Sequence, residues 1–135
     1  MSEMRYSKQA LRAVFLHSKA IGEARKLLLV EAEHELPLAL HGVAGLEIRV
    51  IELDLVTREE FAEFRPDLVL APLLTARFDI LDLAQRLEAI GYTGALRAYC
   101  KPLPNARVVL AEVKNNFPKL DFAIFEVPVV NERDN

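Results

Sequence analysis

The sequence predicts a single α/β domain, covering residues 1–135, that is built on a parallel sheet. Short apolar segments alternate along the chain with segments of helical periodicity, which is the pattern of repeated strand–helix–strand units. Residues 68–74 are apolar throughout, with a proline at position 72, which is typical of a central strand covered by helices on both faces. A chain of 135 residues is long enough to bury one hydrophobic core.

In the first half of the chain we expect two strands around one long helix. Residues 11–16 contain the apolar run A-V-F-L and are predicted to form the first strand. Residues 21–36 show helical periodicity, and Pro37 is expected to interrupt that helix because proline has no N–H to donate. Residues 46–53 alternate apolar and charged side chains, which predicts a second strand at an edge of the sheet.

In the second half the expected elements have clear start and stop signals. Thr57 and Glu60 form a capping box that begins a short helix, which runs to about Phe64. Asp79 is placed to cap a later helix, which Gly91 ends. The remaining strands are predicted over residues 67–74, 95–100 and 120–127, and the remaining helices over residues 80–90 and 106–117. Residues 1–9 are expected to be a loose lead-in, and residues 128–135 a polar tail that frays.

Composition narrows the classes of function. The net charge of −3 gives no electrostatic basis for binding nucleic acid. The only cysteine, Cys100, excludes an internal disulfide and is typical of a reducing compartment. No apolar run approaches the roughly 18 residues of a membrane span, and the N-terminal residues do not read as a signal peptide. We therefore expect a soluble, cytoplasmic protein that has no membrane partner.

The stretch over residues 66–79, P-D-L-V-L-A-P-L-L-T-A-R-F-D, resembles the middle of the receiver domain of two-component response regulators. In receivers a strand of this kind delivers the phosphorylated aspartate, and a second Asp, followed by Gly, stands seven residues further on. In this chain Pro72 stands at the phosphoacceptor position, and Asp79 holds the second position but is followed by Ile80. Cys100 stands at the end of the fourth predicted strand, where receivers place Ser or Thr.

The resemblance covers roughly residues 11–127 and implies a flavodoxin-like three-layer sandwich with strand order 2-1-3-4-5. That order agrees with the charged second strand lying at an edge, but the fifth helix of a receiver is missing. Proline at position 72 cannot be phosphorylated and offers no metal ligand. The first functional hypothesis is therefore a pseudo-receiver that is not an enzyme, has no metal or cofactor, and acts in signalling through protein–protein contacts.

The second hypothesis is a small-molecule or anion-binding sensor or enzyme. In an open parallel sheet the site lies beyond the carboxyl ends of the strands, where the strand order reverses. Receivers place two acidic residues after the first strand, whereas His17 and Ser18 follow the first strand predicted in this chain. The side chains expected around this basic-rimmed pocket are His17, Ser18, Lys19, Arg77, Cys100 and Lys101. Such a rim could hold phosphate or a carboxylate. Cys100 is either a nucleophile activated by Lys101 or, as we favour, a small buried apolar residue.

The missing fifth helix predicts that one face of the sheet is left bare and is covered by a second copy of the chain. The residues expected at this homodimer interface are Arg97, Tyr99, Phe122, Ile124 and Phe125. Large apolar patches are rarely left open in monomers, and two-fold pairing is the commonest way to cover them. The alternative is a monomer in which residues 1–9 or the C-terminal tail fold over the same face.

Overall fold

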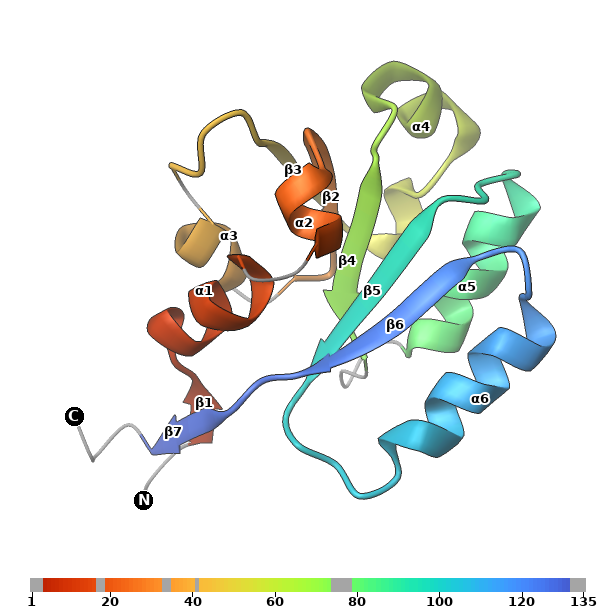
Figure 1. Ribbon diagram of the computed structural model, residues 1–135. Coiled ribbons are helices and arrows are strands. Elements are labelled where there is room, and N and C mark those ends of the chain that lie inside the picture. The colour runs from red at the N-terminus through yellow and green to blue at the C-terminus, as the bar shows by residue number, and fades with distance from the viewer. Residues whose placement is uncertain (1–3, 17–18, 33–34, 41, 74–78, 132–135) are drawn as a thin grey trace.

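The computed structural model describes residues 4–16, 19–32, 35–40, 42–73 and 79–131 (Figure 1). Its main sheet has five parallel strands in the order β3-β2-β4-β5-β6. Their bounds are β2 Lys26–Val30, β3 Glu47–Ile51, β4 Leu68–Pro72, β5 Ala95–Cys100 and β6 Asp121–Glu126. Counted within this sheet the order is 2-1-3-4-5, so the predicted flavodoxin-like α/β fold is confirmed.

Helices cover both faces of the sheet (Figure 1). One face carries α1 (Lys8–Leu16), α2 (Lys19–Glu23) and α3 (Glu35–Leu40), and the other carries α4 (Arg58–Phe64), α5 (Ile80–Ala89) and α6 (Ala106–Asn116). A single 3₁₀ turn, η1 (Leu53–Leu55), follows β3. Two short strands, β1 (Met4–Tyr6) and β7 (Val129–Asn131), pair antiparallel apart from the main sheet. None of the helices in the described ranges combines the length and apolar character needed to cross a bilayer.

The central strand β4 divides the hydrophobic core into two layers. All five of its residues are buried, as the continuous apolar run predicted. Leu68 and Leu70 pack with side chains of α1 and α3, whereas Val69 and Ala71 pack with those of α4, α5 and α6. The alternation follows from the pleat, which sends successive side chains of a strand to opposite faces.

The predicted first strand and first long helix are wrong. Residues 11–16 belong to α1, where Leu11 and Phe15, four residues apart, are both fully buried. The run from Leu27 to Val30, predicted as the middle of a helix, is instead the first strand of the main sheet and is buried on both faces. Pro37 lies in the first turn of α3, where a proline costs little because that N–H has no partner within the helix.

From β3 onward the predicted elements are confirmed within a few residues. The Thr57 hydroxyl caps α4 by accepting a hydrogen bond from Glu60 N at 3.2 Å. The other half of the predicted capping box is not formed, because the Glu60 carboxylate pairs with Arg49 of β3 and so ties the edge strand to α4. Asp79 caps α5 in a full capping box with Asp82. Gly91 then ends α5 in the left-handed conformation, with φ of 84°, which glycine adopts without strain.

Asp67 fixes the start of β4 against the start of β2. Its Oδ2 atom accepts hydrogen bonds from Arg25 N at 3.0 Å and Lys26 N at 2.9 Å. The Asp67 amide in turn donates to Lys26 O at 2.8 Å. The aspartate in the resemblance stretch therefore has a structural role at the amino ends of the strands, opposite the end where receivers carry out their chemistry.

The N-terminal and C-terminal segments also differ from expectation. The lead-in and the tail form β1 and β7, which lie side by side and pair Met4 with Asn131. This pairing brings α1 onto the sheet face that the missing fifth helix was expected to leave bare (Figure 1). Arg12 of α1 donates to Ala39 O of α3 at 2.6 Å, which joins the two helices over that face.

Three aromatic contacts seal the covered face. The Tyr99 ring meets the ring of Tyr6 at 5.5 Å and that of Phe15 at 5.9 Å between centroids. Phe15 also packs against Phe125 at 5.1 Å. Tyr99 is 0% exposed, so the bare face that supported the homodimer prediction does not exist. Tyr6, one of the residues 1–9 that the monomer alternative placed over this face, takes part in the cover, but Leu11 and Phe15 of α1 supply much of it.

The residues predicted for the interface do not share one exposed face. Arg97 pairs with Asp121 at 3.3 Å, and its side chain is 11% exposed. Phe122 and Ile124 face α6, on the side of the sheet opposite Tyr99 and Phe125. These five residues therefore do not form one interface on the face around Tyr99.

Candidate functional site

The carboxyl end of β2 carries an acidic residue that the sequence interpretation missed. Because β2, and not residues 11–16, is the first strand of the main sheet, the residue that follows it is Glu31 rather than His17. Glu31 has a φ of 53°, in the left-handed region, and its amide donates to Ile51 O at 2.9 Å. Its carboxylate accepts a hydrogen bond from Leu53 N at 2.9 Å. The Glu31 carboxylate thus accepts a backbone hydrogen bond at the first residue of η1 and stabilises the start of that turn.

Pro72 ends the central strand and is buried. The next residue, Leu73, donates its amide to Tyr99 O at 2.8 Å and accepts from Ile80 N at 3.0 Å. These bonds fasten the strand end to β5 and to the start of α5. The position at which a receiver carries its phosphoacceptor therefore presents a ring with no nucleophile and no ligand atom.

The Asp79 carboxylate is also occupied by the backbone. Its Oδ1 atom accepts hydrogen bonds from Leu81 N at 2.9 Å and Asp82 N at 3.2 Å. This is the capping role that the sequence predicted as the simpler interpretation of Asp79. Residues 74–78, which connect it to β4, lie outside the described residues.

Cys100 is the last residue of β5 and is only 7% exposed. Burial raises the pKa of its thiol, and the negative charge of Glu126 raises it further. A raised pKa keeps the thiol protonated, whereas the nucleophile hypothesis required Lys101 to lower that pKa. The environment supports the interpretation of Cys100 as a small buried apolar residue.

The predicted basic-rimmed pocket assumed that residues 11–16 form a strand of the main sheet, and these residues are part of α1. His17 and Ser18 follow a helix instead of a sheet strand, and they lie outside the described residues, as does Arg77. Lys19 begins α2, but its side chain is outside the described part of the chain. Lys101 is described and exposed at the end of β5. A shared anion site formed by these side chains remains a prediction.

The carboxyl end of β5 does present apolar side chains to solvent. Leu103, in the loop that follows β5, is 40% exposed, and Val108, in the first turn of α6, is 66% exposed. Arg107 lies between them in the sequence and is also exposed. We call Leu103 and Val108 the carboxyl-end patch. Composition alone did not reveal it, because exposure of a helix or loop residue depends on which helix face packs against the sheet.

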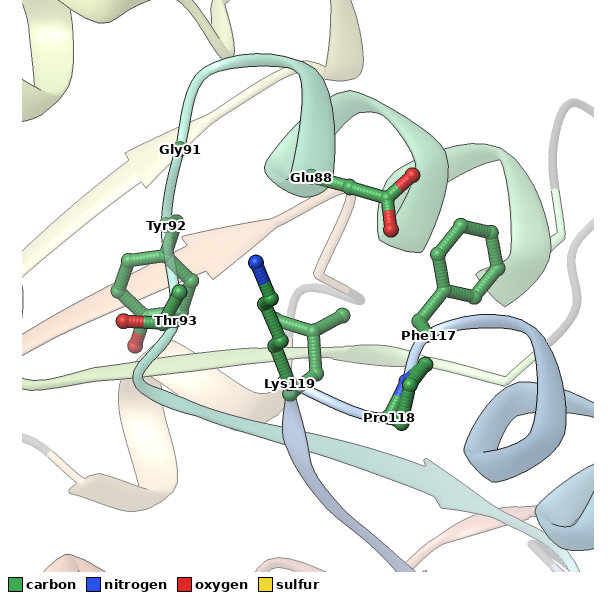
Figure 2. Close-up of a pocket in the computed structure, with 8 residues that line it drawn as sticks. Glu88, Gly91, Tyr92, Thr93, Phe117, Pro118 and Lys119 are labelled. Carbon is green, nitrogen blue, oxygen red and sulfur yellow. The ribbon is translucent and has the colours of Figure 1, made fainter.

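A hollow of about 380 Å³ lies at the opposite end of the sheet, between the turn before β5 and the turn before β6 (Figure 2). It is lined by Glu88, Gly91, Tyr92, Thr93, Phe117, Pro118, Lys119 and Leu120. Glu88, Thr93 and Lys119 supply one acid, one hydroxyl and one base, and Lys119 stands between the other two in Figure 2. This mixture suits docking of a polar surface better than catalysis, because none of these groups is buried.

Tyr92 has a structural role beside this hollow. Its hydroxyl donates to Ala95 O at 2.7 Å, and burial, the main cause, raises the pKa of the phenol. A Cβ atom at Gly94 would lie 2.7 Å from the Tyr92 ring, so any larger residue there would force the ring to move. The predicted turn between α5 and β5 is thus locked by one ring and one glycine.

The described ranges contain no group of three or more His, Cys, Asp or Glu side chains that could hold a metal ion. No family model matches the chain, and no curated protein matches it. The receiver resemblance therefore rests on the residues of the 66–79 stretch and on the confirmed strand order.

Proposed function

We propose that this chain is a non-catalytic, receiver-like protein-binding module that acts in signalling. The observation that carries the proposal is the end of the central strand, where Pro72 is buried at the position in which a receiver would be phosphorylated. A site that cannot accept a phosphoryl group leaves binding as the function that this end of the fold can serve.

The neighbouring groups support binding over chemistry. The carboxylates of Glu31 and Asp79 each accept backbone hydrogen bonds, which stabilises turns and helix ends. The Cys100 thiol has a raised pKa and is therefore a poor nucleophile near neutral pH. None of these three side chains has the surroundings that activate a catalytic group.

The carboxyl-end patch gives the proposal a surface. Leu103 is exposed in the loop before α6, and Arg107 and Val108 are exposed in the first turn of that helix. Protein interfaces commonly combine an apolar centre with a polar rim, and arginine is enriched in them. We propose a partner that carries an apolar side chain with a carboxylate beside it. The free Cys100 supports a reducing, cytoplasmic setting.

The test compares partner capture by the intact chain and by two variants. Leu103→Ser combined with Val108→Ser should abolish specific capture of a partner from the native cell, because both apolar contacts are lost. Val50→Ser on β3 is the matched control. Val50 is 50% exposed, between the values for Leu103 and Val108, but it lies on the edge strand at the other side of the sheet. The control should capture the partner as the wild type does.

Both variants should fold, because surface substitutions change stability by only about 0.5 kcal/mol. A partner held equally by all three proteins would show that the carboxyl-end patch is not the binding surface. Turnover of any small substrate by the wild type would contradict the proposal more broadly.

A further inference from the structure

The outer edge of β6 has no partner strand in the described part of the chain, because β6 is the last strand in the sheet order. The amides of Asp121 and Val127 donate inward, to Gly94 O and Cys100 O respectively. Since a strand alternates its hydrogen-bonding groups with a period of two, the backbone N–H and C=O of Phe122, Ile124 and Glu126 point outward. Such an edge is a template for pairing with another strand.

A groove of about 420 Å³ runs beside this edge, between β6 and α6. It is lined by Ala106, Arg107, Leu110, Lys114, Phe122, Ala123, Ile124 and Glu126. A crossover helix runs antiparallel to the strand that follows it, as α6 and β6 do in Figure 1. Lys114 therefore lies toward the Phe122 end of the strand, and Arg107 toward the Glu126 end. The groove has an apolar floor, with Lys114 near one end and both Arg107 and Glu126 near the other.

We propose that a second copy of this chain occupies the groove, with the two β6 strands pairing antiparallel about a two-fold axis at Ile124. In this register Phe122 lies opposite Glu126 of the second copy, so the outward N–H and C=O groups of both strands are satisfied. The result is one continuous sheet of ten strands across the dimer, twice the five of each chain. The interface is isologous, as a two-fold axis requires.

Charge complementarity favours a second copy over an unrelated strand. The register brings the Glu126 carboxylate of each copy beside Lys114 of the other, and the two-fold axis forms this contact twice. Asp121, the acid at the other end of β6, is already paired with Arg97 at 3.3 Å and so does not repel the incoming Glu126 strongly. Each chain thus supplies both partners of the contact, the acid Glu126 on β6 and the base Lys114 on α6.

This inference goes beyond the proposed function and does not depend on it. The carboxyl-end patch and the β6 edge are tested with different residues, so a monomeric chain could still capture a protein partner. The proposed surface shares Phe122 and Ile124 with the interface predicted from the sequence, but it is the edge of β6 and not the face around Tyr99, which is buried under α1. If the chain proves to be monomeric, capture of a partner by the carboxyl-end patch can still be tested, and the reverse also holds.

Sedimentation equilibrium of charge-reversal variants tests the register. The wild type should sediment at micromolar concentration as a dimer of the 15.2 kDa chain. Lys114→Glu alone and Glu126→Lys alone should each raise the dissociation constant by about tenfold or more, since each creates two like-charge contacts. The double variant Lys114→Glu/Glu126→Lys restores complementarity across the axis and should recover the wild-type constant. Lack of recovery would overturn the register.

A backbone variant tests the strand pairing itself. Ile124→Pro removes one outward-pointing N–H without touching the inward bonds to β5, so it should yield a folded monomer. Ile124→Val keeps that N–H and is the matched control, which should remain dimeric. Far-UV circular dichroism checks the fold, and if the proline variant unfolds, the charge reversals decide alone. A wild type that sediments only at 15.2 kDa, or a dimer that survives the reversals, would overturn the proposal.

Discussion

Replacing Tyr99 with alanine should lower the free energy of unfolding by about 3–5 kcal/mol, the usual cost of removing a large aromatic side chain from a core. The Tyr99 side chain is fully buried and lies edge-on to both Tyr6 and Phe15. Its loss opens a cavity where β1, α1 and β5 meet. Urea unfolding followed by circular dichroism measures the change.

A double-mutant cycle shows whether this cost comes from the packing of α1 on the sheet. Tyr99→Ala and Phe15→Ala together should show a coupling energy of about 0.5–1.5 kcal/mol, the range for an aromatic pair. Val108→Ala, at an exposed site, serves as the control and should change stability by less than about 0.5 kcal/mol. A cost below about 1 kcal/mol for Tyr99→Ala would mean that α1 does not cover this face.

Leu70→Ala is expected to cost about 2–5 kcal/mol for the same physical reason. Leu70 is 0% exposed at the middle of β4 and packs in the core layer beneath α1 and α3. The strands on each side, β2 and β5, hold the backbone in place, so the cavity cannot collapse easily. Chemical denaturation with an unchanged m-value would identify the effect as lost packing.

The matched control for Leu70 is Leu55→Ala. Leu55 lies in η1 and is 54% exposed, so removing its side chain leaves no cavity. Its variant should stay within about 0.5 kcal/mol of the wild type. Equal costs at the two leucines would contradict the placement of β4 at the centre of the sheet.

The second half of the fold could be predicted because the chain marks its element boundaries chemically. Thr57 and Asp79 supply helix caps, and Gly91 stops a helix because glycine adopts the left-handed conformation without strain. The apolar run of β4 is short and bounded, so it could be assigned to a central strand. Local signals and the observed structure agree wherever these residues occur.

The first half could not be predicted from local patterns alone. The run from Leu27 to Val30 is apolar at every position, so its periodicity fits either a buried strand or a buried helix. The pairing of Met4 with Asn131 joins the two ends of the described chain, and three-residue strands leave no pattern to detect. Tertiary contacts, above all those of Phe15 and Tyr99, decide this part of the structure.

The site was predicted in part for the same reasons. The placement of Pro72 at the end of the central strand could be predicted because β4 itself was predicted, and Pro72 is the last residue of that strand. Glu31 was missed because the first strand was placed upstream, although an apolar run followed by an acid is visible in the sequence. The raised pKa of Cys100 depends on its burial and on Glu126, which is distant in sequence and adjacent only in the folded sheet.

Phosphorylation of the intact chain tests most directly whether the end of the central strand can accept a phosphoryl group. The protein is incubated with acetyl phosphate and Mg²⁺, with a catalytically competent receiver domain as the control for the reagent, and its intact mass is measured. The mass should stay that of the unmodified chain, and beryllofluoride with Mg²⁺ should leave the thermal midpoint unchanged, because Pro72 offers no acceptor. A stoichiometric phosphoryl adduct on this chain, or a magnesium-dependent shift with beryllofluoride, would contradict the proposal of a non-catalytic binding module.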